Sequence, residues 1–217
     1  MADNQILVVG LGRFGSALAR EAVALGHEVL GIDTDAKVVQ QHADDLTHVV
    51  QADSTDPEAL RQLGVGEFPV AIVAIGSDLE ASILTTAALA DVGIPIIWAK
   101  AVTEAHGRIL ERVGADHVVY PEGDMGRRVA HRVVGRVLDW FQLDEDFAMV
   151  ETTIPADLVG CSLGEAGVRA KHGVTVVAIK PTGGVFGYAT ADTVPGPGDV
   201  VVVSGRTKAV ERFAERP

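Results

Sequence analysis

The sequence predicts an α/β protein in which a doubly wound parallel sheet is followed by a small α+β domain. Three observations predict this fold. Short apolar runs alternate with helix-like segments as far as Tyr120. A glycine-rich turn separates the first apolar run from the first helix. Beyond Asp144 the pattern changes to alternating, strand-like segments separated by glycine and proline turns.

The first domain is expected to alternate strands with helices. Val70–Ile75 is a continuous apolar run, as in a parallel strand that is buried on both faces. Leu18, Ala22 and Leu25 recur on one side of the first helix. The six expected strands are at residues 6–10, 28–32, 47–51, 70–75, 94–99 and 117–120. The expected helices are at residues 14–25, 36–43, 57–63, 80–92 and 105–113.

A longer helix is expected to follow the sheet. Val129, Val133, Val137 and Phe141 recur every four residues, which predicts a helix from Met125 to Phe141. Two interpretations stay open. The helix either packs on the sheet as an ordinary amphipathic helix, or it leads out of the first domain as a crossover or dimerisation helix.

The rest of the chain is expected to form a mostly antiparallel module. Strands are expected at residues 147–154, 174–180, 185–188 and 200–204, and helices at 163–170 and 207–215. The expected organisation is therefore a first domain at residues 1–124, a linking helix at 125–143 and a second domain at 144–217.

Composition narrows the function. The formal charge of −12 opposes binding to nucleic acid and to anionic lipid. Cys161 is the single cysteine, so no intrachain disulfide can form, which fits a reducing cytoplasm. The first residues lack the pattern of a signal peptide, and no apolar run approaches the roughly 18 residues that cross a bilayer. We therefore expect any role at a membrane to act through a partner.

The strongest motif is Gly10-Leu11-Gly12-Arg13-Phe14-Gly15. It follows a strand, opens a helix and precedes a second strand that ends at Asp33, which is the context that a dinucleotide-binding fingerprint requires. Gly10 permits the tight turn, Gly12 lets the backbone approach a pyrophosphate, and Gly15 lets the helix pack on the strand. Asp33 can accept hydrogen bonds from both ribose hydroxyls. These residues predict an adenine-nucleotide site.

Other candidates follow the remaining strands. Arg13 faces either phosphates, a neighbouring subunit or solvent. Asp53 and Ser54 follow the third strand, where an adenine would lie, although they can equally cap the next helix. The segment Ile75-Gly76-Ser77-Asp78 ends the fourth strand, across the switch point from the glycine loop.

Lys100 and Glu122 complete the candidate set. Lys100 ends the fifth strand, where it either meets phosphate or is simply exposed. Glu122 follows the sixth strand and could ligate a divalent ion such as Mg²⁺ or Ca²⁺ beside phosphates, or could be an ordinary surface residue.

The residues that an enzyme would need are not found. Neither Tyr120 nor Tyr188 has a lysine four residues later, and the seven histidines form no ligand pair. Cys161 has no evident activating partner. We therefore expect a protein that is not an enzyme. The alternatives are an NAD-dependent oxidoreductase, which the first domain alone would permit, and a regulator that senses NAD and binds DNA, which the acidic charge disfavours.

Several segments resemble the KtrA/TrkA family of cytosolic regulators of potassium conductance, the RCK proteins. In the first domain they are Val9-Gly-Leu-Gly-Arg-Phe-Gly, Asp33, Ile97-Trp-Ala-Lys-Ala and Pro121-Glu-Gly-Asp-Met-Gly. Val168-Arg-Ala-Lys-His-Gly resembles the C-terminal RCK module. The resemblance spans nearly the whole chain, whose length matches the single KtrA-like form rather than the tandem TrkA form.

The resemblance implies a function. Such subunits form an octameric ring beneath a membrane-embedded potassium transporter, on the cytoplasmic face, and ATP and ADP compete for the N-terminal site. It implies that Asp33 binds ribose, that Arg13 and Lys100 contact phosphates, and that Glu122 holds a divalent cation. It also implies a cyclic di-AMP site near Val168, Arg169 and Ala170, although Gly164-Glu-Ala-Gly stands where KtrA relatives carry an apolar pair and an asparagine.

Overall fold

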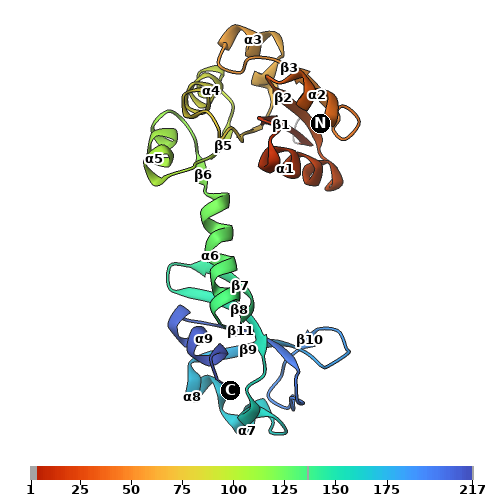
Figure 1. Cartoon of the computed structure of the whole chain (residues 1–217), viewed down its shortest axis with the longest axis vertical. Helices are drawn as coiled ribbons and strands as arrows, with labels where there is room; N and C mark the ends of the chain where they lie inside the picture. The colour runs from red at the N-terminus through yellow and green to blue at the C-terminus, as the bar shows by residue number, and fades with distance from the viewer. Residues whose placement is uncertain (1–3, 136, 217) are drawn as a thin grey trace. The chain divides into compact units, whose positions relative to one another are not determined.

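A computed structural model describes residues 4–135 and 137–216 of the chain (Figure 1). Contacts divide the chain into two compact units, residues 1–122 and 123–217, and each is described by itself. Among the described residues, no helix is both long and apolar enough to cross a membrane. The predicted combination of a parallel, Rossmann-like sheet with a smaller α+β unit is confirmed.

The N-terminal unit is a six-stranded parallel sheet in the order β3-β2-β1-β4-β5-β6. Its strands are β1 (Gln5–Val9), β2 (Glu28–Asp33), β3 (His48–Gln51), β4 (Val70–Val73), β5 (Ile96–Lys100) and β6 (His117–Val119). Its helices are α1 (Arg13–Ala24), α2 (Ala36–His42), α3 (Pro57–Gln62), the short 3-10 turn η2 (Val65–Glu67), α4 (Leu79–Val92) and α5 (Glu104–Arg112). The chain adds β2 and β3 on one side of β1 and then β4, β5 and β6 on the other side. This reversal of the strand order creates a switch point at the carboxyl ends of β1 and β4.

The two faces of this sheet carry separate apolar cores. Leu7 and Val9 point to a core that α3, α4 and α5 complete, whereas Val8 points to a core that α1 completes. The central strands β1, β2 and β4 are buried on both faces, which explains why they read as continuous apolar runs in the sequence.

Polar side chains fix where the helices begin. Asp35, Asp56 and Asp78 cap α2, α3 and α4, because each carboxylate accepts a hydrogen bond from a backbone N–H in the first turn. Gly93 ends α4 in the left-handed conformation with φ of 90°. The alternative that Asp53 and Ser54 cap the helix after β3 is therefore wrong, because the cap of α3 is Asp56, which accepts from the Glu58 N–H.

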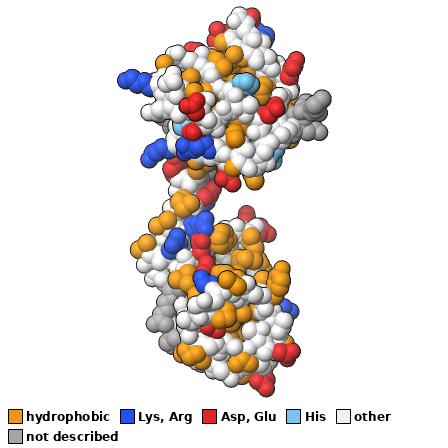
Figure 2. Space-filling view, turned by 90° about the vertical axis from the view of Figure 1, so that its right-hand side faces the viewer, with side chains coloured by type: hydrophobic (Ala, Val, Ile, Leu, Met, Phe, Trp, Pro, Cys, Tyr) orange, Lys and Arg blue, Asp and Glu red, His pale blue; other side chains and the backbone are white. Residues whose placement is uncertain are grey.

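The C-terminal unit is an antiparallel sheet in the order β10-β9-β11-β8-β7. Its strands are β7 (Val137–Asp144), β8 (Phe147–Thr153), β9 (Val174–Lys180), β10 (Gly187–Tyr188) and β11 (Val200–Gly205). Its helices are α6 (Pro121–Val134, which begins in the first unit), the 3-10 turn η3 (Ala156–Leu158), α7 (Leu163–Ala166), α8 (Val168–His172) and α9 (Thr207–Ala214). Its core gathers around Val150, Val203 and Phe213. Hydrophobic side chains are also exposed on the visible surface of this unit (Figure 2).

The predicted helix from Met125 to Phe141 is wrong at both ends. Helix α6 begins four residues earlier, at Pro121, and ends at Val134, and the segment from Val137 onward is strand β7. The register of β7 against β8 shifts between Val137 and Asp139. Because of that irregularity, Val137 and Trp140 are both buried although they are three residues apart, a spacing that reads as helical.

Two smaller predictions in this unit also need correction. The helix expected at residues 163–170 is two short helices, because Gly167 between them has a left-handed φ of 62°. The strand expected at residues 185–188 is reduced to Gly187 and Tyr188 at the edge of the sheet.

Candidate nucleotide-binding site

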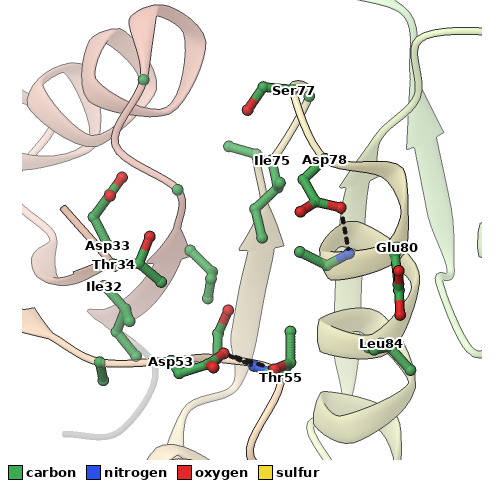
Figure 3. Close-up of a pocket in the computed structure, with 18 residues that line it drawn as sticks. Ile32, Asp33, Thr34, Asp53, Thr55, Ile75, Ser77, Asp78, Glu80 and Leu84 are labelled. Carbon is green, nitrogen blue, oxygen red and sulfur yellow. Dashed lines mark hydrogen bonds between the residues drawn. The ribbon is translucent and has the colours of Figure 1, made fainter.

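A cavity of about 490 Å³ opens at the carboxyl ends of β1 to β4 (Figure 3). This is where ligands bind in doubly wound sheets. Asp33 and Asp53 lie on the side of β2 and β3, and Leu84 faces them from α4 (Figure 3). The predicted residues that line the cavity are Gly10, Gly12, Asp33, Asp53, Ser54, Ile75, Gly76 and Ser77.

The glycine loop has the backbone that the motif predicts. Gly10 has φ of 90°, and its N–H donates to the Ile32 carbonyl at 2.8 Å. Gly15 is packed so tightly against the Gly10 carbonyl that an added Cβ would overlap it. Helix α1 begins at Arg13, and no side chain caps its N-terminus. The first turn of α1 is therefore free to bind an anion.

Asp33 joins the glycine loop to the turn that follows β2. Its Oδ2 accepts from the Leu11 backbone N–H at 2.7 Å, and its Oδ1 accepts from the Asp35 N–H at 2.9 Å. A carboxylate oxygen has a second acceptor position. The Asp33 side chain can therefore fix the glycine loop and still accept from the hydroxyl groups of a ribose.

Asp53 and Ser54 form a rigid corner after β3. Asp53 Oδ1 accepts from the Thr55 hydroxyl at 2.6 Å and from the Thr55 N–H at 2.9 Å, and these bonds lower the pKa of Asp53. The Ser54 hydroxyl is buried and lies 2.8 Å from that of Thr85 on α4. The corner is thus tied to the far wall of the cavity and presents an ionised carboxylate to it.

The remaining predicted residues form a second cluster beside the cavity. Lys100 Nζ lies 2.6 Å from Glu122 Oε1 and 5.8 Å from the centre of the Phe14 ring. The hydrogen bond from Lys100 lowers the pKa of Glu122, and the positive charge of Arg13 lowers it further. The structure therefore brings Arg13, Phe14, Lys100 and Glu122 together. The alternative that Lys100 is simply exposed is wrong, because the residue is buried and pairs with Glu122. Its contact with phosphate stays a prediction.

Several lining residues were not predicted from the sequence. They are Val9, Ile32, Thr34, Ala52, Thr55, Ala74, Glu80, Ala81 and Leu84. Thr34 and Thr55 immediately follow the predicted residues Asp33 and Ser54, so their places next to these residues in the sequence could have identified them. Asp78 to Leu84 belong to the cap and first turns of α4, which the predicted switch point already placed beside the ligand.

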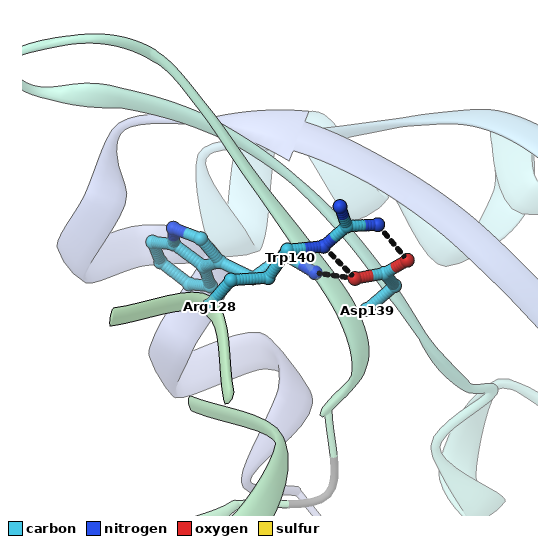
Figure 4. A network of polar contacts seen from close by, with 3 residues as sticks. All are labelled: Arg128, Asp139 and Trp140. Carbon is cyan, nitrogen blue, oxygen red and sulfur yellow. Dashed lines mark hydrogen bonds and ion pairs between the residues drawn. The ribbon is translucent and has the colours of Figure 1, made fainter. Parts of the chain in front are cut away.

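Helix α6 continues from Glu122 and is held to β7 by a salt bridge (Figure 4). Arg128 donates to both oxygens of Asp139, at 2.7 and 2.6 Å, and Asp139 also accepts from the Trp140 N–H. This arrangement lowers the pKa of Asp139. His131 stacks on the Trp140 ring at 3.8 Å. The second half of α6 is therefore fixed to the C-terminal sheet.

The second predicted ligand segment lies on α8. Val168 is buried in the core of the C-terminal unit, so its side chain is not available to a ligand. Arg169 and Ala170 are exposed, and Arg169 Nε donates to the Thr175 hydroxyl at 3.0 Å. Among the described residues, no group of three or more potential ligands could hold a metal ion.

Known proteins resemble the chain along nearly its whole length. The TrkA-N domain model matches residues 6–121. The Ktr system potassium uptake protein C of Bacillus subtilis (strain 168) is 38% identical over 98% of this chain and 97% of its own. The Ktr system potassium uptake protein A of the same organism is 37% identical over 97% of this chain and 96% of its own.

Solved structures show the same fold. The GsuK RCK domain superposes with a TM-score of 0.70 at 19% identity and covers 99% of this chain, which spans 48% of that one. A GsuK channel bound to NAD has a TM-score of 0.70 at 19% identity, covering 99% of this chain and 40% of that one. GsuK bound to ADP is 27% identical with a TM-score of 0.53, over 61% of this chain and 34% of that one.

Proposed function

Because this chain belongs to the TrkA-N family, and to its KtrA-like branch of regulatory subunits, we propose that it is a nucleotide-responsive regulator of a membrane potassium transporter. The observation that carries the proposal is the relationship to two Ktr system potassium uptake proteins, which extends through both units rather than the nucleotide fold alone. A relationship confined to the first unit would have been equally compatible with many enzymes.

The ligand of the N-terminal site is an adenine nucleotide. In this proposal the ribose binds Asp33, the adenine lies between Asp53-Ser54 and Ile75, and the diphosphate lies over Gly12 at the start of α1. The ADP-bound structure of GsuK, at 27% identity, supports this assignment. The carboxylate of Asp33 disfavours a 2′-phosphate, which argues against NADP.

The response to ATP and ADP arises at the cluster of Arg13, Lys100 and Glu122. The γ-phosphate adds negative charge, which two cations can meet. Glu122 is ionised, exposed and beside these cations, so it can hold a divalent ion only together with phosphate oxygens, water or a group from another subunit. Mg²⁺ or Ca²⁺ would supply the charge that lets the carboxylate and the phosphates lie close together.

The nucleotide acts by shifting a conformational balance. ATP and ADP regulate transport only if they bind two conformations of the assembly with different affinities. Glu122 lies in the first turn of α6, and Arg128 joins the same helix to the C-terminal sheet. Helix α6 therefore connects the nucleotide site with the second unit and carries the change.

Self-association completes the proposed assembly. Met125, Val129 and Val133 recur along α6 and are exposed, Val133 by 78%. A second copy that covers this stripe would remove apolar surface from water. We place the chain in an octameric ring on the cytoplasmic face of the membrane, where its transporter partner spans the bilayer. Cyclic di-AMP would act through Arg169 and Ala170 of the C-terminal unit.

The site is proposed to bind and release nucleotide without chemistry. In the N-terminal unit, His106 is buried, its pKa is lowered by that burial, and its Nδ1 accepts from the Val102 N–H. Tyr120 contacts Gly107 of α5 and packs against the core of that sheet face. Both side chains are engaged in the fold of the unit, which does not support a role as proton donors to a substrate in the cavity.

Release of the bound ligand tests this proposal. The purified chain is denatured, and the released compounds are separated and their absorption spectra recorded. ADP or ATP with the adenine band alone is the expected result. Release of NADH, which absorbs near 340 nm, together with turnover of a substrate would instead establish the alternative, an NAD-dependent oxidoreductase.

A further inference from the structure

Three side chains join the end of α9 to two other segments of the C-terminal unit. Arg216 follows α9, and its Nη1 lies 2.9 Å from Nε2 of His172, the last residue of α8. Its Nη2 donates to the carboxylate of Asp157 in η3. The buried Phe213 ring of α9 meets the His172 ring edge-on. The last turn of α9 is therefore fastened to both α8 and η3.

The contact with Arg216 requires a neutral histidine. A guanidinium group stays charged and has only N–H donors, so His172 Nε2 must be the acceptor. The proton of the neutral ring is therefore on Nδ1. A protonated ring has no acceptor, so protonation of His172 would bring two positively charged donors together and break the hydrogen bond.

The charges around the ring decide when it is protonated. Asp157 favours the charged form, whereas Arg216 and Lys171 oppose it. Arg169, the remaining charged residue of α8, donates to a hydroxyl of β9. Burial of the ring is the largest effect, and together these groups lower the pKa of His172. At neutral pH the ring is therefore neutral, and the contact is formed.

We infer that the contact between His172 and Arg216 is a proton-sensitive latch, which holds the last turn of α9 at neutral pH and releases it on acidification. The latch gives the chain a response to pH that does not depend on the proposed nucleotide site. Its parts all belong to the C-terminal unit.

Release of this turn acts next to α6. Ala214 and Glu215, at the end of α9, line one cavity with Ala130 and Val134 of α6. Helix α6 starts in the first unit and continues into the second. The latch therefore lies beside the cavity wall that belongs to the connecting helix, so protonation can alter how that helix is supported.

The test is deuterium exchange of the full-length chain at pH 8 and at pH 5, followed by mass spectrometry, with each rate divided by the intrinsic rate at that pH. Amides of residues 210–216 should exchange about tenfold faster at the acidic pH in the wild type. In His172→Gln, the amide oxygen can accept from Arg216 at both pH values, so exchange should be slow at both. His131→Gln is the matched control, because His131 stacks on Trp140 instead, and it should keep the wild-type response.

A second variant opens the latch without changing the histidine. Arg216→Ala should exchange rapidly at the end of α9 at both pH values, and it provides the test if the melting curve of His172→Gln departs from that of the wild type. Four results would overturn the inference. They are wild-type exchange that does not change with pH, acceleration that spreads equally over β8 and β11, acid acceleration that persists in a folded His172→Gln, and slow exchange of Arg216→Ala at pH 8.

Discussion

Lys100 and Glu122 form an ion pair of 2.6 Å between the last residue of β5 and the first turn of α6. The lysine is buried and the glutamate is largely exposed, with side-chain exposures of 11% and 61%. Because Glu122 is partly solvated, the ion pair is weak, and Lys100 can exchange Glu122 for a ligand phosphate. The pair therefore lies where a change in the nucleotide can be transmitted to α6.

Arg13→Ala should reduce discrimination between ATP and ADP. If Arg13 meets the γ-phosphate, its loss should lower the ratio of the two affinities about tenfold, or about 1.4 kcal/mol, while ADP binding changes little. Arg20→Ala is the matched control, because Arg20 lies on the same helix and pairs with Asp45 at 3.6 Å. Titration with both nucleotides measures the ratio, and an unchanged ratio in Arg13→Ala removes Arg13 from the mechanism.

Glu122→Gln should abolish the effect of divalent ions on ATP binding. The amide can still accept from Lys100, but it lacks the charge that a hard cation requires. We expect Mg²⁺ to strengthen ATP binding to the wild type about tenfold and to leave the variant unaffected. Asp124→Asn makes the same charge change two residues later, where Asp124 pairs with Arg127, and it should retain the Mg²⁺ effect. Equal Mg²⁺ dependence in Glu122→Gln would contradict the proposed cation site.

Asp33→Asn should weaken the binding of ADP about tenfold, because charged acceptors form the stronger hydrogen bonds to ribose. The change also weakens the bond that Asp33 accepts from Leu11. Asp35→Asn is the control, since Asp35 caps α2 and asparagine caps helices equally well. Fluorescence titration with a labelled ADP measures both variants. Comparable loss of affinity in the two variants would mean that Asp33 acts by holding the turn between β2 and α2 rather than by binding the ribose.

Acidification should destabilise the C-terminal unit through His172. Burial lowers the pKa of His172, and the positive charge of Arg216, whose guanidinium is 2.9 Å from the ring Nε2, lowers it further. Nearby, Asp157 opposes this effect and Lys171 adds to it. A group whose pKa is lower in the folded state contributes stability that is complete above its unfolded value, near 6.5 for histidine, and is lost as the pH falls below it.

The check is a series of urea unfolding curves between pH 8 and pH 5 for the wild type and His172→Gln. The variant should lose part of the dependence on pH in the window below about 6.5. His106→Gln provides a comparison, because burial also lowers the pKa of His106 in the other unit. Identical pH dependence in the wild type and in His172→Gln would exclude the histidine as its source.

The sheet of the N-terminal unit could be predicted because its signals are local. Apolar runs such as Val70–Val73 are buried on both faces, and aspartates and a threonine cap the helices between them. The positions of Gly10, Asp33 and Asp53 at one edge follow from the direction of parallel strands. The positions of the strand ends and the order of the strands were therefore sufficient to predict that Gly10, Asp33 and Asp53 lie together.

Strand β7 and the Lys100–Glu122 pair could not be predicted in this way. The irregular register of β7 gives the buried residues Val137 and Trp140 a helical spacing. The helical period of apolar residues in α6 therefore continues into β7, and the sequence pattern predicted one long helix. The pairing of Lys100 with Glu122 depends on the Lys100 side chain turning across Gly76, which is a tertiary arrangement. The sequence placed each residue just at or after the end of a parallel strand, but their mutual contact has no signature in the sequence.

Rubidium influx into proteoliposomes that contain a Ktr membrane subunit tests the central claim most directly. The chain is added to the vesicle surface with ATP, with ADP or without nucleotide, and the Asp33→Asn variant is measured in parallel. The account predicts that influx with ATP exceeds influx with ADP several-fold and that Asp33→Asn loses this difference. Influx that is the same with ATP, with ADP and without the chain would contradict the account.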